Sequence, residues 1–286
     1  MDAKARHGSQ FFFGKPSELT EDKRQASTSE FLSRATAALL SLRRLSVLVG
    51  LLIIWEFCAR WGIVNGQVFP PPSRILGGIK QLAEFGLLWN DVSASILRVT
   101  IGFAFATLIG ITLAAVLARV ETLAYYIMPI VELIRPISVI AWIPIAILWF
   151  GLGDKPAWFI IFLGSFFPIF TNTYVGFRSV APIHIQAAKC FGAGRWLFFR
   201  KVLFPSALPY ILTGMRIGLG FGWMCVIAAE MIAATSGLGY MIQLARNLME
   251  TERIFAGMII IGIVGFTMNQ AMLWLERRLT PWRAET

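Results

Sequence analysis

Four charged residues lie inside long apolar stretches of this chain: Glu132, Arg135, Arg216 and Glu230. A charged side chain in hydrocarbon costs roughly 3 kcal/mol or more, so one that persists usually faces a water-filled cavity or another charge. The two arginines could lower the barrier for a small anion that crosses such a cavity, and the carboxylates could balance their charge when it is empty. The residues equally allow both arginines to pair with carboxylates and only fix helix packing.

The spacing of these residues places them on helix faces. Glu132 and Arg135 are three positions apart, as in an ion pair within one helix. Arg216 comes 11 residues after Pro205, or roughly 16 Å along a helix, which predicts a position near the middle of the membrane. Glu230 comes 14 residues later, close to four turns, so it is expected on nearly the same side of that helix.

Residues for catalysis are scarce. The histidines are His7, near the N-terminus, and His184, in a basic loop, so no catalytic centre built on histidine is expected among the apolar stretches. Cys58, Cys190 and Cys225 form no CxxC pair, which argues against a disulfide framework or a metal site. The sequence also lacks a GxxxxGK[ST] phosphate loop, so the chain is not expected to hydrolyse a nucleotide by itself.

The composition indicates an all-α, polytopic integral membrane protein. Hydrophobic residues make up 57% of the chain, charged residues 15%, and the mean hydropathy is +0.68. A bilayer core about 30 Å thick requires roughly 20 apolar residues per helix. About six transmembrane helices are predicted, at residues 45–63, 97–118, 122–151, 156–177, 206–234 and 255–275.

The distribution of basic residues predicts the orientation. With six spans, both termini and the loop 178–205 share one side, which would hold 17 of the 26 lysines and arginines. The positive-inside rule makes that side cytoplasmic, so the net charge of +10 is read as a topology signal rather than a sign of nucleic-acid binding. Residues 1–44 are polar and predict a cytoplasmic tail before a transmembrane domain, 45–286.

A short helix is predicted on the outer side. Pro70, Pro71 and Pro72 make a stiff break, and Ser73 can cap the helix that follows. Its apolar residues are expected on one face: Ile75, Leu76, Ile79 and Leu82. This helix could either cover the bundle or dock a partner.

The loop 178–205 is basic and only moderately polar, and it lies between two apolar runs. After Pro182, residues 183–191 predict a short helix, and residues 192–194 predict a flexible turn. Residues 195–203 predict a second helix that Pro205 closes. The loop is therefore predicted to be a helical projection on the cytoplasmic face.

The order of residues in this loop resembles the EAA signature of the membrane subunits of binding-protein-dependent ABC importers. That signature is Glu-Ala-Ala, three residues, Gly, nine residues, Ile, one residue, Leu-Pro, and this chain matches its spacing throughout. The corresponding positions are Gln186, Ala187, Ala188, Gly192, Val202, Phe204 and Pro205. The resemblance implies that they form coupling helices in a groove of an ATPase subunit. Gln186 replaces the family's Glu and keeps its hydrogen-bonding capacity without its charge.

The resemblance extends over roughly residues 68–283 and is to the taurine, alkanesulfonate and nitrate branch. It rests on the stretches 132–136, 141–144, 149–153, 214–218, 228–235, 237–239 and 277–282. It implies a type I ABC importer permease fold in the bacterial inner membrane, without a cofactor of its own. Two ABC ATPase subunits would bind ATP and Mg, a periplasmic or lipid-anchored binding protein would deliver the solute, and a second copy of the chain would complete the pathway.

Prolines and glycines bear on whether the helices move. Pro129, Pro136, Pro144 and Pro168 are expected to bend or interrupt two spans. The fifth span carries glycines that allow close helix contact, at Gly214, Gly218, Gly220 and Gly222. These features fit either tight packing or a gate.

Two other classes of protein remain open on the residues alone. An ion-coupled secondary transporter usually has internal repeats, and no convincing repeat relates the two halves. An integral-membrane enzyme would need a nucleophile or metal cluster, for which Ser, His and Cys are not arranged. Within the importer interpretation, the cargo could be taurine, another alkanesulfonate, nitrate or bicarbonate.

Overall fold

The computed structural model describes residues 46–47, 49–62, 65–84, 86–192 and 194–281. The chain divides into two units, Met1–Gly66 and Gln67–Thr286. In the first unit, residues 46–47 and 49–60 are helical, and an ion pair joins Arg60 to Glu56 one turn away. The predicted tail, 1–44, lies outside the described residues, as do the start of the first predicted span, 45–63, and its last residue.

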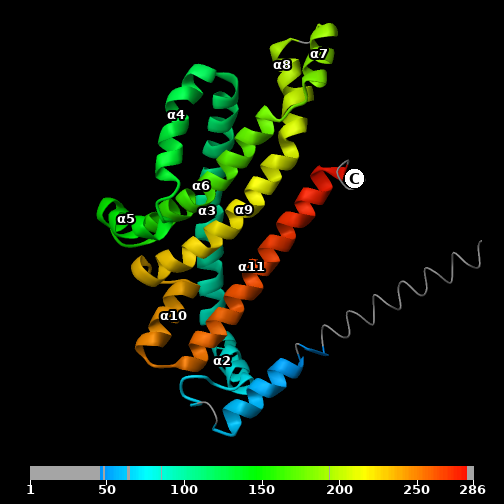
Figure 1. Ribbon diagram of the computed structural model, residues 1–286. Helices are drawn as coiled ribbons and strands as arrows, with labels where there is room; N and C mark the ends of the chain where they lie inside the picture. The colour runs from blue at the N-terminus through cyan, green and yellow to red at the C-terminus, as the bar shows by residue number, and fades with distance from the viewer. Residues whose placement is uncertain (1–45, 48, 63–64, 85, 193, 282–286) are drawn as a thin grey trace, which may run out of the picture. The chain divides into compact units, whose positions relative to one another are not determined.

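Helices are the only regular secondary structure among the described residues of the second unit (Figure 1), as predicted. Its α-helices are α2 (Pro72–Glu84), α3 (Leu87–Arg119), α4 (Glu121–Ile134), α5 (Ile143–Phe150), α6 (Asp154–Arg178), α7 (Pro182–Cys190), α8 (Arg195–Phe198), α9 (Phe204–Ala233), α10 (Leu238–Asn247) and α11 (Thr251–Leu279). A 3₁₀ turn, η1 (Val139–Trp142), precedes α5, and a π-helical turn, η2 (Phe199–Leu203), precedes α9.

Four of the described helices are long and apolar enough to cross a membrane, and a bent pair counts as a fifth span. The four are Leu88–Arg119, Asp154–Arg178, Trp196–Ala233 and Thr251–Leu279. The predicted spans at 156–177, 206–234 and 255–275 are therefore confirmed. The span predicted at 97–118 begins about ten residues too late, because Asp91 also belongs to its helix and has a polar partner within the fold.

Helix α6 lies at the centre of the second unit, packed against α3 and α9 (Figure 1). Glycines on α9 allow this close approach. A β-carbon added at Gly218 would lie 2.9 Å from the carbonyl oxygen of Ser165, and one at Gly222 would lie 2.5 Å from its hydroxyl. The backbones of α6 and α9 are thus as close as glycine permits at these two levels.

The third predicted span, 122–151, is broken. Helix α4 ends at Ile134, and the chain turns by 91° before η1 and α5 continue. The break follows from Pro136, whose missing N–H removes the helical hydrogen bond to the carbonyl of Glu132. Pro129 remains inside α4 and Pro168 inside α6, so neither interrupts its helix.

Pro205 does not close the helix that precedes it, contrary to prediction. Helix α8, the π turn η2 and α9 form one continuous helical segment, Trp196–Ala233. A proline ring inside an α-helix clashes with the carbonyl four residues earlier, and the wider π turn before Pro205 shifts that carbonyl away. The amide of Phe204 instead bonds to the carbonyl of Phe199.

Helix α2 begins at Pro72 and packs against α11 and α3. Ile75, Gly78 and Leu82 are buried, whereas Leu76, which was predicted on the same apolar face, is 66% exposed. An exposed ion pair of 3.8 Å joins Arg74 to Glu252 of α11. The helix therefore covers part of the bundle, as one of the two predicted roles requires.

Candidate functional site

The segment from α7 to Pro205, called the coupling segment below, projects beyond α6 and α9 (Figure 1). Helix α7 ends just before Gly192, whose φ of 64° is left-handed, a conformation that glycine adopts without strain. This agrees with the predicted helix, turn and second helix, although Ala193 lies outside the described residues. The matched positions are thus held on two helices that meet at a tight turn.

The two faces of α7 differ. Gln186 and Ala187 are exposed, whereas Ala188 is buried against the rest of the coupling segment. Phe191 is 90% exposed and Trp196 is 72% exposed, which is unusual for large aromatic side chains outside an interface. The outer face of the coupling segment therefore offers apolar and amide groups for a partner to cover.

A cavity of about 310 Å³ lies between α7 and the start of α9. His184, Ala187 and Ala188 line one side of it, and Lys201 and Val202 line the other. Val202 is half-buried and lines this cavity opposite α7, which corresponds to a packing role between the two helices. The two helical parts of the coupling segment are therefore separated by an open cavity and do not form one continuous helix.

Glu132 and Arg135 are exposed at the bend of the third span. Arg135 is the C-cap of α4, with a backbone N–H that donates to the carbonyl of Val131. The ion pair expected between Glu132 and Arg135 is not formed, and neither side chain has a charged partner among the described residues.

Arg216 pairs with a residue that the sequence did not single out. Its Nε lies 3.5 Å from Oε2 of Glu276 on α11, without the alignment of a hydrogen bond. Thr213, one turn earlier on α9, donates a 3.4 Å hydrogen bond to the other oxygen of Glu276. Arg216 therefore links α9 to α11, as expected if its role is to fix helix packing.

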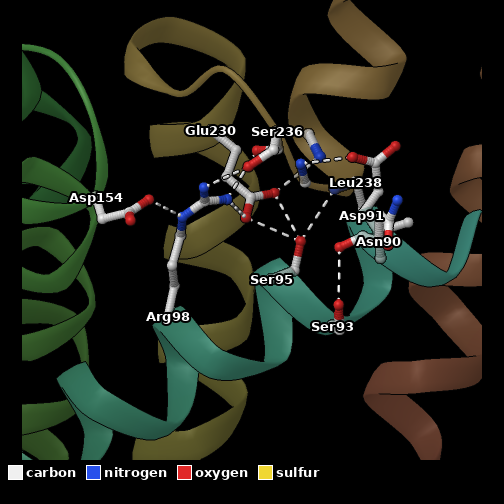
Figure 2. A network of polar contacts seen from close by, with 11 residues as sticks. Asn90, Asp91, Ser93, Ser95, Arg98, Asp154, Glu230, Ser236 and Leu238 are labelled. Carbon is white, nitrogen blue, oxygen red and sulfur yellow. Dashed lines mark hydrogen bonds and ion pairs between the residues drawn. The ribbon is translucent and has the colours of Figure 1, made fainter. Parts of the chain in front are cut away.

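Glu230 is the acceptor at the centre of a buried polar network (Figure 2). Arg98 on α3 donates to its Oε1 at 2.7 Å, and the hydroxyl of Ser95 lies 2.8 and 2.9 Å from its two oxygens. The same guanidinium donates at 2.7 Å to Asp154, in the first turn of α6. It also donates to the carbonyl and the hydroxyl of Ser236, at 2.7 and 2.8 Å.

The loop between α9 and α10 wraps closely around this carboxylate. The amide of Gly239 donates to Glu230 at 2.9 Å, and the amide of Gly237 donates to Asp91 of α3 at 2.8 Å. Gly237 has a φ of 108°, and a β-carbon added there would overlap the Glu230 carboxylate. Four elements, α3, α6, α9 and α10, are therefore tied together at one point.

The predicted pathway residues do not come together. Glu132 and Arg135 lie at the bend, Arg216 lies between α9 and α11, and Glu230 lies in the buried network. Sequence reasoning did not single out Arg98, Asp154 or Glu276 as site residues. The available signal was an arginine at the edge of the apolar run 97–118, a position where a charge needs a partner.

Comparison with known proteins agrees with this geometry. Residues 106–284 match the family described as "Binding-protein-dependent transport system inner membrane component". The chain is 36% identical to the taurine transport system permease protein TauC of Escherichia coli (strain K12), over 84% of this chain and 90% of that one. It is 34% identical to the putative aliphatic sulfonates transport permease protein SsuC of Bacillus subtilis (strain 168), over 82% and 84%.

A solved structure shares the fold. One chain of the inward-facing MetNI methionine ABC transporter superposes with a TM-score of 0.60, covering 68% of this chain and 96% of that chain at 20% identity.

The family match decides several predictions. It confirms a multi-pass membrane subunit that is not itself an enzyme, and it implies partners that hydrolyse ATP and deliver solute. The chain belongs to the inner membrane components of binding-protein-dependent transport systems, as an ABC importer permease of the taurine, sulfonate and nitrate branch.

Proposed function

We propose that this permease imports taurine or another alkanesulfonate from the periplasm to the cytoplasm. Nitrate and bicarbonate are the alternative cargoes, and the binding protein makes most of the choice among them. Support for a sulfonate comes from the similarity to taurine and aliphatic sulfonate permeases over more than four fifths of the chain. A second line of support is the exposed Arg135 at the bend in the third span.

The exposed guanidinium of Arg135 is the observation that carries the proposal. It lies at a 91° break within an apolar span, where a charge that faced lipid would be costly. Irregular backbone in a membrane is tolerated where it borders protein or a water-filled cavity. Arg135 therefore lines a wet pathway, and its planar guanidinium can donate two parallel hydrogen bonds to an anion with several oxygens.

The same reasoning supports a pair of permeases. Glu132 near the end of α4 and Arg135 at its C-cap are not covered by any other described part of the chain. A second copy of the chain, facing them across the pathway, removes them from lipid and places two Arg135 residues around one cavity. Glu132 then offsets part of the positive charge when no anion is present. The homodimer is thus part of the proposal.

The continuous segment Trp196–Ala233 supplies the mechanical link in this proposal. One ABC ATPase docks on the exposed face of each coupling segment, where Gln186, Ala187 and Phe191 are accessible. The 38 residues from Trp196 to Ala233 correspond to a lever of roughly 57 Å. ATP-driven closure of the two ATPases moves these levers, opens the cavity to the binding protein, and is reversed by hydrolysis.

The orientation follows from the charge distribution. The coupling segment and both termini lie in the cytoplasm, while α10 and the Glu230 network lie at the outer end. ATP and Mg are held by the ATPase subunits, and this chain requires no cofactor of its own.

Reconstitution tests the proposal. The permease, its ATPase and its binding protein are placed in liposomes, and uptake of labelled taurine is followed with ATP on the ATPase side. Uptake that requires ATP and the binding protein, and that nitrate or bicarbonate does not displace, is the expected result. Preferential displacement by nitrate or bicarbonate would select the alternative cargoes. Uptake driven by an ion gradient without the ATPase would identify a secondary transporter.

A further inference from the structure

An apolar groove of about 330 Å³ lies beside the coupling segment, at the end of α3. Its size is at the low end of the range for ligand pockets, about 300–1,000 Å³. The end of α3 contributes one wall, and the end of α6 with the stretch from α8 to α9 contributes the other. The lining residues are Ile111, Thr112, Ala115, Val116, Arg119, Phe177, Trp196, Phe199 and Phe204.

The groove extends from the membrane interface into the hydrocarbon region. Arg119 is the last residue of α3, and Ile111 lies eight residues deeper in the same span, or roughly 12 Å along the helix. The deeper part is lined by aliphatic side chains. Trp196, which is 72% exposed, lies with Arg119 at the shallow end, and both residue types are typical of the interface between lipid and water.

A fixed positive charge marks the shallow end. The guanidinium of Arg119 lies 5.1 Å from the ring centroid of Phe199, so a cation–π contact holds it beside the groove. Two exposed arginines adjoin groove residues in the chain: Arg178 follows Phe177, and Arg200 follows Phe199. Arg178 is paired with Glu121 at 3.6 Å, and the three arginines outnumber this carboxylate.

We propose that the groove binds one acidic phospholipid of the cytoplasmic leaflet. The phosphate group lies against Arg119, and part of one acyl chain fills the apolar groove between Ile111 and Phe204. Charge selects the occupant: cytoplasmic leaflets are rich in anionic lipids, and basic pockets between helices on that side bind their headgroups. A neutral lipid would fill the same apolar space without using the arginine.

The position of this lipid gives it a role in coupling. It touches α3, which belongs to the bundle, and Trp196 and Phe199, which belong to the coupling segment. A bound lipid would therefore contact both α3 and the start of the segment Trp196–Ala233, and would stabilise their packing against each other. This role rests on the proposed orientation, whereas lipid binding itself can be measured on the full chain in detergent, independently of transport.

Native mass spectrometry of the purified full chain is the test. The protein is titrated with dioleoylphosphatidylglycerol or dioleoylphosphatidylcholine, and the lipid adducts are counted. We expect one phosphatidylglycerol to be retained preferentially. One basic residue near a lipid surface contributes about a five-fold factor in binding, so Arg119→Gln should weaken retention about five-fold, and Arg119→Lys should retain most of it.

Two further variants separate the groove from general surface charge. Arg278→Gln is the matched control, since Arg278 also lies in the last turn of a span and stacks on an aromatic ring, Trp274, at 4.2 Å; it should leave retention unchanged. Thr112→Phe should lower retention by filling the groove from an exposed position. The proposal would be overturned if the protein retained both lipids equally or retained no lipid. It would also be overturned if Arg119→Gln and Arg278→Gln lost retention equally.

Discussion

Arg98 and Glu230 are 132 positions apart in the sequence, and a 2.7 Å hydrogen bond between charged groups joins them in the interior of the bundle. The side chain of Arg98 is 6% exposed and that of Glu230 is 0% exposed. A buried pair of this kind is expensive to break, because removing one partner leaves the other charge uncompensated. The contact (Figure 2) also fixes α3 relative to the C-terminal end of α9, whereas the coupling segment joins its N-terminal end.

Replacing the buried carboxylate should be strongly destabilising. Glu230→Gln keeps an acceptor for Gly239 but leaves Arg98 with Asp154, which is 53% exposed, as its one charged partner among the described residues. We expect the free energy of unfolding to fall by about 3 kcal/mol. Unfolding by SDS in mixed micelles, followed by circular dichroism, measures this change.

The control for this variant is Glu84→Gln. Glu84 pairs with Lys80 at 3.8 Å on an exposed face of α2, where a salt bridge contributes at most about 1 kcal/mol. A loss of stability in Glu230→Gln no larger than that in Glu84→Gln would mean that the network does not hold the helices together.

Replacing glycines of α9 by alanine should change the free energy of unfolding by an amount that depends on the atoms facing each glycine. Gly218→Ala places a methyl group 2.9 Å from the carbonyl of Ser165 and the side chain of Ile169. We expect it to destabilise the α6–α9 contact by about 1–3 kcal/mol, a typical cost of overpacking. Gly220→Ala is the matched control, with no atom within 4 Å, and it should be neutral or stabilising by up to about 1 kcal/mol. The same micelle titration compares them, and equal effects would contradict the packing interpretation.

The sequence sufficed for the features that local pattern determines. The apolar runs placed α6 and α9 within two residues of their observed ends, since apolar length is the main requirement of a span. Pro182 and the turn at 192–194 placed α7 and the start of the helix that follows it. The apolar runs and the pattern of the coupling segment each lie within the same few tens of residues as the helices that they predict.

Features that depend on distant contacts could not be predicted in this way. The partners of Arg98 lie 56 to 138 positions away, so no local pattern identifies them. The partner of Arg216 is likewise on another helix, at Glu276. The continuity of the helix through Pro205 depends on a π turn, which has no clear sequence pattern.

The exposed face of α7 should control coupling to the ATPase. Ala187→Asp adds a charge to a face that a partner must cover, while Ala188, next to it, is buried and would confound the test. We expect the variant to fold normally but to lose most of the stimulation of ATP hydrolysis by solute-loaded binding protein. Ala181→Asp, an equally exposed alanine before α7, should retain it. Normal stimulation in Ala187→Asp would contradict docking at this face.

Arg135 and Arg216 should respond differently to the loss of their charge. Arg135 has no carboxylate partner among the described residues, so Arg135→Gln should leave the free energy of unfolding within about 0.5 kcal/mol of the original value, as for other exposed sites. It should nevertheless slow uptake of taurine by ten-fold or more, because a sulfonate crossing the bend loses a charged donor. Arg216→Gln breaks the ion pair with Glu276, so its effect should appear mainly in stability and should be shared by Glu276→Gln. Uptake rates in liposomes and unfolding in micelles distinguish the two patterns. If Arg135→Gln transports taurine at the original rate, the anion does not pass this guanidinium, and the pathway must lie elsewhere in the bundle.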